Sequence, residues 1–150
     1  MSQSSDILRK LSSMSDRDLL ARLIWGEARG ELSVGQLAVA HVAVNRLELG
    51  RYGAKGGLKG VMLKPWQFSC FNANDPNLLL LLQPPMREPF TCCQLLAELV
   101  LADLTVDPTG YATHYFNPDV VPGRWPKPWD KAKMTFRKKI GRHEFWRELP

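Results

Sequence analysis

The sequence predicts one mainly helical α+β domain with a small β-hairpin towards its C-terminal end. Three stretches begin with a Ser or Thr that is followed three residues later by an acid or a Gln, a helix-capping pattern. Further along, Gly141-Arg142 separates two strand-like runs, as in a two-residue hairpin turn. A chain of 150 residues can bury a real core. We expect a lead segment over 1–14 and a single domain over 15–150.

The first two helices of this domain are predicted from capping residues and glycine stops. The first is expected to begin at Ser15 and to run to about Gly30, with a stripe of leucine and isoleucine at helical spacing. The second is expected over 34–49, with Ser33 as its cap and Gly50 as its stop. Its alanines suit close packing against another helix.

The remaining elements follow from turn and composition signals. Residues 50–60 are rich in glycine and are predicted to form a mobile loop. A third helix is expected from Thr91 to about 105, followed by a turn at 107–110 and a short extended segment. A Pro/Trp-rich loop over 124–129 leads into the hairpin.

Composition and charge argue against several classes of protein. The longest apolar run, 78–82, is too short to span a membrane, and the N-terminal residues show no signal-peptide pattern. Cys70, Cys92 and Cys93 have no zinc-site spacing, so we expect reduced thiols, no metal and no cofactor. The net charge of +5 favours an anionic partner. Because the basic residues are dispersed, a nucleic-acid binder is the weaker reading.

Glu27 interrupts the apolar stripe of the first predicted helix. It follows two leucines in a row at four-residue spacing, and Glu31 follows it in the same row. A carboxylate at the rim of a core is costly unless it is paired or opens to a cleft. Periodicity alone favours an ion pair over a general acid, whose proton would be held by burial and by a neighbouring carboxylate. The candidate partners are Arg22, Arg29 and Arg46.

Glu31 lies one helical turn beyond Glu27. This spacing falls within the range of the paired carboxylates of glycosidases, so Glu31 is a possible second acid. The alternative, a solvent-exposed acid beyond the helix-ending Gly30, is favoured.

Several motifs together resemble one family. The stretch LARLIWGEARGE…GQLAVAHVAVNRL…GVMLKPWQFSCFN, with DPTGYATHYFNP and KKIGRHEFWR, is similar to the catalytic region of SleB/CwlJ-type cell wall hydrolases, which include spore cortex-lytic enzymes. The similarity covers residues 18–147. It implies a lysozyme-like or lytic-transglycosylase-like helical core, peptidoglycan glycan strands as partner, and one catalytic glutamate, Glu27. The resemblance therefore reverses the preference for an ion pair.

The family's chemistry implies cleavage between N-acetylmuramic acid and N-acetylglucosamine. In a lytic transglycosylase, Glu27 would protonate the leaving oxygen and then deprotonate the muramoyl 6-hydroxyl, which attacks C1. No second protein carboxylate is needed. An N-acetylmuramidase would use water and usually a second acid. A non-catalytic wall-binding or virion structural protein is the rival from another class.

The resemblance also implies a set of substrate-binding residues. Amides and hydroxyls among them suit hydrogen bonds to N-acetyl groups or sugar hydroxyls, and their aromatic rings, with Trp66, suit stacking on sugar faces. For each ring the alternative is core packing, and for His143 it is a structural hydrogen bond across the hairpin. The set comprises Gln67, Phe68, Ser69, His114, Tyr115, Asn117 and His143.

Two features look particular to this chain. Tyr111 stands where family members often have the second glycine of D-P-T-G-G-A, so it either alters the turn or adds an aromatic wall to the cleft. The segment 73–90 is expected to cap one end of the groove. Without a signal peptide or a wall-binding repeat, we expect a monomeric, endolysin-like protein of a phage or prophage. It would be made in the cytoplasm and reach the wall by assisted release.

Overall fold

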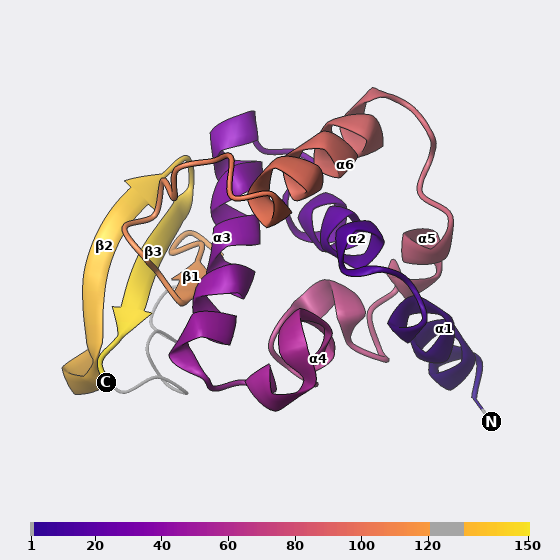
Figure 1. Cartoon of the computed structure of the whole chain (residues 1–150), viewed down its shortest axis with the longest axis horizontal. Coiled ribbons are helices and arrows are strands. Elements are labelled where there is room, and N and C mark those ends of the chain that lie inside the picture. The colour runs from indigo at the N-terminus through magenta and orange to yellow at the C-terminus, as the bar shows by residue number, and fades with distance from the viewer. Residues whose placement is uncertain (1, 121–130) are drawn as a thin grey trace.

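The computed structural model describes residues 2–120 and 131–150, a helical core with a small antiparallel sheet on one side (Figure 1). The fold class predicted from the sequence is confirmed. The helices are α1 (Gln3–Ser12), α2 (Asp16–Ala28), α3 (Ser33–Leu49), α4 (Gly57–Leu63), α5 (Leu78–Leu82) and α6 (Glu88–Leu101). The strands are β1 (His114–Phe116), β2 (Met134–Ile140) and β3 (His143–Glu148). The predicted loop over 124–129 lies outside the described residues.

Helix α2 is the centre of the core. The Ser15 hydroxyl accepts a hydrogen bond from the Asp18 amide at 3.1 Å, which confirms the predicted cap. The predicted apolar stripe is fully buried, and α2 packs against α3, α4 and α6. Helix α1 adds Ile7 and Leu11 to the same core.

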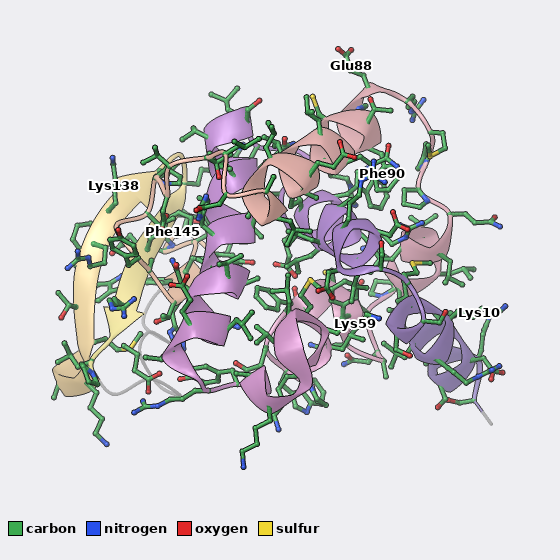
Figure 2. All side chains as sticks on the ribbon, viewed as in Figure 1. Lys10, Lys59, Glu88, Phe90, Lys138 and Phe145 are labelled. Carbon is green, nitrogen blue, oxygen red and sulfur yellow. The ribbon has the colours of Figure 1, made fainter. Side chains whose placement is uncertain are left out.

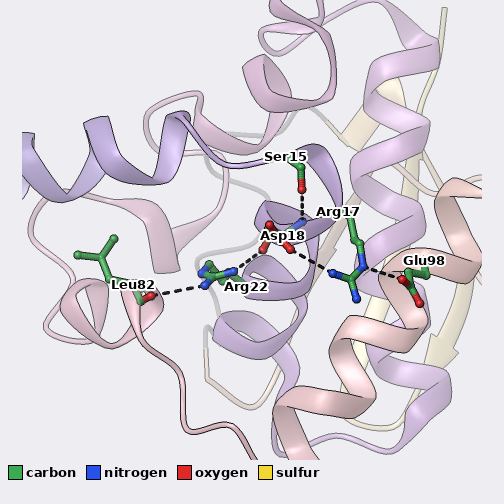
Figure 3. A network of polar contacts seen from close by, with 6 residues as sticks. All are labelled: Ser15, Arg17, Asp18, Arg22, Leu82 and Glu98. Atoms are coloured by element: carbon green, nitrogen blue, oxygen red, sulfur yellow. Dashed lines mark hydrogen bonds and ion pairs between the residues drawn. The ribbon is translucent and has the colours of Figure 1, made fainter.

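Arg22 attaches the segment after residue 73 to α2 (Figure 3). Its Nε donates to the Leu81 carbonyl at 2.6 Å and its Nη2 to the Leu82 carbonyl at 3.4 Å, and these carbonyls close the C-terminal end of α5. Charged donors of this kind offset the unsatisfied carbonyls of a helix end. An ion pair between Arg17 and Glu98 joins α2 to α6. Because it lies at the surface, it adds little stability.

Two predicted helix caps, Ser33 and Thr91, are wrong. Helix α3 is preceded by Leu32 in an extended conformation, without a side-chain cap, although Gly50 ends it in the left-handed conformation as predicted. Helix α6 begins at Glu88 rather than at Thr91. A proline in its first turn already has helical φ, and the Thr91 hydroxyl donates back to the Glu88 carbonyl instead of capping.

The prediction of a mobile loop over 50–60 is also wrong. This stretch contains a short 3-10 turn, Ala54–Gly56, and the start of α4. A Cβ on either Gly53 or Gly60 would collide with the carbonyl oxygen of the other. The glycines therefore serve the close approach of two backbone segments, not mobility.

The predicted hairpin is confirmed, and a third strand joins it. The sheet order is β1-β3-β2, all antiparallel, with Tyr115 opposite Phe145. Gly141 takes φ +56° in the turn. Figure 2 shows Lys138 on the edge strand β2 directed away from the protein, whereas Phe145, 1% exposed, belongs to the core. An edge strand rich in cations resists pairing with other chains.

The turn before β1 is organised by Asp107. One of its carboxylate oxygens accepts from the amide and hydroxyl of Thr109, at 2.7 and 2.6 Å. The other accepts from Asn45 at 2.8 Å and from the amide of Tyr111 at 3.1 Å. Burial alone would raise the pKa of Asp107, but the hydrogen bonds from Thr109 and Asn45 outweigh it and hold the pKa below its ordinary value.

Asp107→Asn should lower the free energy of unfolding by about 2 kcal/mol at pH 7. The side-chain NH₂ group of the new Asn would face N–H donors that now bind a carboxylate oxygen, and these donors would lose their acceptor. The carboxylate's contribution is present above the pKa of an unfolded Asp and is lost as pH falls through the lower folded pKa. The stability gap to wild type should therefore close in acid, as measured by urea unfolding between pH 7 and pH 3. An equal effect of Asp119→Asn, at an exposed aspartate, would contradict this account.

Tyr111 holds φ +65° with its side chain 61% exposed, so the family's glycine at this position has a conformational reason. Tyr111→Gly should raise the free energy of unfolding by about 1 kcal/mol, or Tm by about 3 °C. The backbone bonds of Tyr111 to Asp107 and Arg147 do not require the ring. A fall in Tm on calorimetry would show that the exposed ring stabilises the turn.

Candidate active site

An open cavity of about 480 Å³ lies where α2, α3, the 64–72 segment and β1 meet. Its lining is polar and aromatic, and Glu27 is the only acid that the described part of the chain contributes to it. Predicted site residues from three separate parts of the chain are thus brought together. The lining residues are Glu27, Arg46, Tyr52, Trp66, Gln67, Ser69, Asn72, His114 and Tyr115.

The Glu27 carboxylate is held by three hydrogen-bond donors. Its Oε1 accepts from the Ser69 hydroxyl at 3.1 Å and from the Cys70 amide at 2.9 Å. Its Oε2 accepts from the Tyr115 hydroxyl at 2.8 Å. The side chain is therefore fixed in orientation while it faces the cavity.

Glu27 makes no ion pair within the described part of the chain, so the alternative favoured by periodicity is wrong. The three candidate arginines are engaged elsewhere. Arg22 donates to carbonyls at the end of α5, and Arg29 stacks on Trp25. Arg46 lines the cavity but donates to backbone carbonyls.

Gly26 explains how the donors reach Glu27. A Cβ at this position would lie 2.8 Å from the Cys70 Cβ and 2.9 Å from its Sγ. The missing side chain lets the short turn Ser69–Phe71 pack directly on α2. That contact presents the Ser69 hydroxyl and the Cys70 amide to the carboxylate one residue further along the helix.

Arg46 forms the buried cationic floor of the cavity. It is 4% exposed, and its guanidinium lies 4.7 Å from the centre of the Phe68 ring and 5.4 Å from that of Tyr52. Nε donates to the Thr113 carbonyl at 2.6 Å and Nη1 to the Gln67 carbonyl at 3.4 Å. Burial lowers the pKa of Arg46, an effect partly opposed by Tyr115 and other nearby acidic groups.

Three neighbours of Glu27 stay neutral near pH 7. Burial, and then the charge of Glu27, raise the pKa of the Tyr115 phenol and of the Cys70 thiol well above their ordinary values. Burial lowers the pKa of His114 to about 3, with the nearby Arg46 adding to the effect. The titratable neighbours of the Glu27 carboxylate therefore carry no charge that could pair with it.

The rings predicted to stack on sugars fall into two groups. Phe68 is 2% exposed and lies beneath Arg46, so its predicted stacking role is wrong and core packing holds. Trp66 is 74% exposed at the cavity and takes φ +68°. Its amide donates to Asn72 Oδ1 at 3.0 Å, which fixes the segment that carries the ring.

Besides Phe68, three predicted site residues do not line the cavity. Glu31 turns towards the hairpin, where its Oε1 lies 3.6 Å from His143 Nδ1. His143 in turn packs edge-on against Tyr115, with ring centres 5.7 Å apart. Asn117 instead accepts a hydrogen bond from the Asp119 amide within its own turn.

Residues 73–90 contribute nothing to the cavity lining, so the cap predicted there is not seen. Sequence reasoning also missed Tyr52 as a lining residue. Its ring packs edge-on against His114, and its hydroxyl donates to Glu148 Oε2 at 2.6 Å. Asn72, likewise missed, directly follows the aromatic motif QFSCF, which was the available signal.

Residues 2–120 and 131–150 contain no group of three or more His, Cys, Asp or Glu side chains suited to a metal ion. The same ranges contain no helix long and apolar enough to cross a membrane.

Two solved structures share the fold of this chain and are also similar to it in sequence. The catalytic domain of the Bacillus cereus SleB protein is 30% identical, with a TM-score of 0.59 over 87% of this chain and 88% of that chain. The catalytic domain of the germination-specific lytic transglycosylase SleB from Bacillus anthracis is also 30% identical, with a TM-score of 0.60 over 89% of this chain and 96% of that chain.

Two curated protein sequences are also similar to this chain. The spore cortex-lytic enzyme of Halalkalibacterium halodurans is 34% identical over 134 residues, which are 89% of this chain and 35% of that protein. The spore cortex-lytic enzyme of Bacillus cereus is 33% identical over 89% of this chain and 44% of its own length. The chain thus spans less than half the length of these relatives. Residues 30–146 match the Cell Wall Hydrolase family. With this match and the shared fold, the chain belongs to the Cell Wall Hydrolase family.

Proposed function

We propose that this chain cleaves the glycan strands of peptidoglycan as a lytic transglycosylase, with Glu27 as its single acid and base. The observation that carries the proposal is one oriented carboxylate in an open cavity, without a cationic partner or a second lining acid among the described residues. The similarity to a lytic transglycosylase of Bacillus anthracis supports the same reading.

The first step of the reaction breaks the bond between N-acetylmuramic acid C1 and the oxygen of N-acetylglucosamine. Protonated Glu27 gives its proton to that oxygen as the C1–O bond breaks, and positive charge develops at C1. In the second step the Glu27 carboxylate takes the proton of the muramoyl 6-hydroxyl. The freed oxygen bonds to C1, which leaves a 1,6-anhydro end and returns Glu27 to its protonated form without consuming water.

The hydrogen bonds support different roles for the two oxygens of Glu27. Oε1 accepts from two donors, Ser69 and the Cys70 amide, so it stays unprotonated in both steps. Oε2 has one donor, the Tyr115 hydroxyl, which can rotate and accept when Oε2 carries the proton. We therefore assign proton transfer to Oε2.

Sugar binding falls to the rest of the lining. Gln67 and Ser69 supply polar groups for N-acetyl and hydroxyl oxygens, and the exposed Trp66 ring suits stacking on a sugar face. The net charge of +5 suits an anionic wall. The predicted monomeric state and the phage-lysis setting remain predictions.

An N-acetylmuramidase is the second candidate. It would use Glu27 in the same first step and place water at C1 in the second. Glu31, as a second acid, is disfavoured because its carboxylate faces His143 rather than the cavity. A non-catalytic wall-binding protein would also explain the fold, and only an activity assay separates it from the enzyme.

Glu27→Gln should reduce muropeptide release from purified sacculi by about 10³-fold or more, because the amide can neither give nor take the proton. Release is measured by mass spectrometry, and calorimetry checks that the variant is folded. Glu31→Gln is the matched control and should keep most of the activity. Equal losses in both variants, or full activity in Glu27→Gln, would overturn the assignment.

Tyr115→Phe should lower kcat by about tenfold with little change in KM, because it removes the hydrogen bond to Oε2 and leaves the cavity surface nearly unchanged. Tyr111→Phe, at an exposed tyrosine outside the cavity, should leave both constants unchanged. A rise in KM alone on defined glycan fragments would mean that Tyr115 binds sugar and does not serve proton transfer.

A further inference from the structure

A second cavity, of about 230 Å³, lies between the C-terminal end of α2 and the segment that leads into α6. Trp25 and Arg29, which line it, are each two positions away from Glu27. Two residues of an α-helix turn through about 200°, so this cavity opens on the face of α2 opposite the active-site cavity. The remaining lining residues are Gly30, Pro85, Arg87 and Pro89.

Two arginines line this cavity, and among the described residues neither has a carboxylate partner. Neither Arg29 nor Arg87 forms an ion pair with any described residue, whereas Arg9, Arg17 and Arg51 all do. Figure 2 shows the neighbouring Glu88 side chain directed outward from the start of α6. Two unpaired cations at one cavity favour an anionic ligand.

The Arg29 side chain is already ordered for such a ligand. Its guanidinium lies 4.5 Å from the centre of the Trp25 ring, and Nη1 reaches the Trp25 carbonyl at 3.5 Å. Stacking engages the face of the guanidinium, so its N–H donors other than that of Nη1 remain for a planar acceptor. A side chain held in this way loses less conformational freedom on binding.

The other walls of the cavity are apolar and stiff. Trp25 is 6% exposed, and Pro85 and Pro89 have φ fixed by their rings. Gly30 adds no side chain, and a Cβ there would meet no atom within 4 Å. The cavity therefore suits a ligand with a carboxylate and small apolar groups more than a polyol phosphate, which has only polar faces.

We propose that this cavity binds the carboxylate end of a peptidoglycan peptide stem, whose alanine methyl groups would contact the proline and tryptophan walls. The proposal rests on the proposed function for the choice of polymer. It assigns Arg29 and Arg87 to substrate recognition on the face opposite the glycan cleft. Binding there would hold the protein on peptide-bearing wall independently of the chemistry at Glu27.

The direct test is calorimetric titration of the whole chain with a soluble stem tetrapeptide. We expect one saturable site, weakened about tenfold or more in Arg29→Gln/Arg87→Gln, because charge-assisted hydrogen bonds are lost. Arg9→Gln/Lys10→Gln removes the same charge from exposed positions on α1 and should bind as wild type does. The wild-type chain should bind a tetrapeptide with an amidated C-terminus as weakly as Arg29→Gln/Arg87→Gln binds the tetrapeptide with a free carboxylate.

Three results would overturn the proposal. They are no saturable binding of the tetrapeptide, equal binding by Arg29→Gln/Arg87→Gln, and equal or tighter binding of a glycerol phosphate oligomer. The last result would identify a phosphate site instead. Calorimetric melting of both double variants establishes that they are folded before titration.

A second assay separates this inference from the proposed function. Arg29→Gln/Arg87→Gln should cleave peptide-free glycan strands at the wild-type rate and peptide-bearing sacculi several-fold more slowly. Equal rates on both substrates would contradict the inference while leaving the glycosidase intact. Peptide binding by an inactive wild-type chain would sustain the inference while the proposed function fails.

Discussion

The buried guanidinium of Arg46 is the interaction on which the rest of the structure depends. It lies on α3 and donates to the Thr113 carbonyl just before β1 and to the Gln67 carbonyl in the aromatic segment. These two segments lie 46 residues apart in the sequence, from position 67 to position 113, and no local pattern would bring them together. A buried cation is stable only when its donors are satisfied, so folding of the core requires both walls of the cavity to be in place.

The same constraint prepares the cavity for chemistry. With the two walls fixed, Ser69 and Tyr115 meet the carboxylate of Glu27 from opposite sides. The pKa shifts of Tyr115 and His114, both caused mainly by burial, keep these neighbours neutral. A single proton-exchanging carboxylate is what an internal attack by the substrate's own hydroxyl needs, whereas activation of water usually needs two. This difference is the reason we propose transglycosylation rather than hydrolysis.

Local signals predicted the elements that depend on local physics. The cap at Ser15, the stop at Gly50 and the turn at Gly141 were all correct because each rests on the geometry of a few consecutive residues. The glycines of residues 50–60 led to a wrong prediction, since glycine permits both a flexible loop and a close backbone approach, and only the partner segment decides between them.

Within the candidate site, the sequence predicted Glu27 and most of the residues that line the cavity with it. It did not predict which side chains contact one another. Glu31 was expected either in the cleft or in solvent, whereas it pairs with His143, a residue 112 positions later. Phe68 was expected at the cleft surface and lies buried under Arg46 instead. Gly26 gave no usable signal, because its role depends on the tertiary contact with Cys70. Such contacts between distant segments are set by packing, which a single sequence does not display.

The central claim is that one carboxylate serves as both acid and base and that water takes no part in the reaction. Digestion of purified sacculi in water enriched in oxygen-18, followed by mass spectrometry of the muropeptides, tests it most directly. The account predicts 1,6-anhydromuramoyl ends without the heavy isotope. Reducing N-acetylmuramic acid ends that each carry one oxygen-18 atom would contradict it and identify a hydrolase.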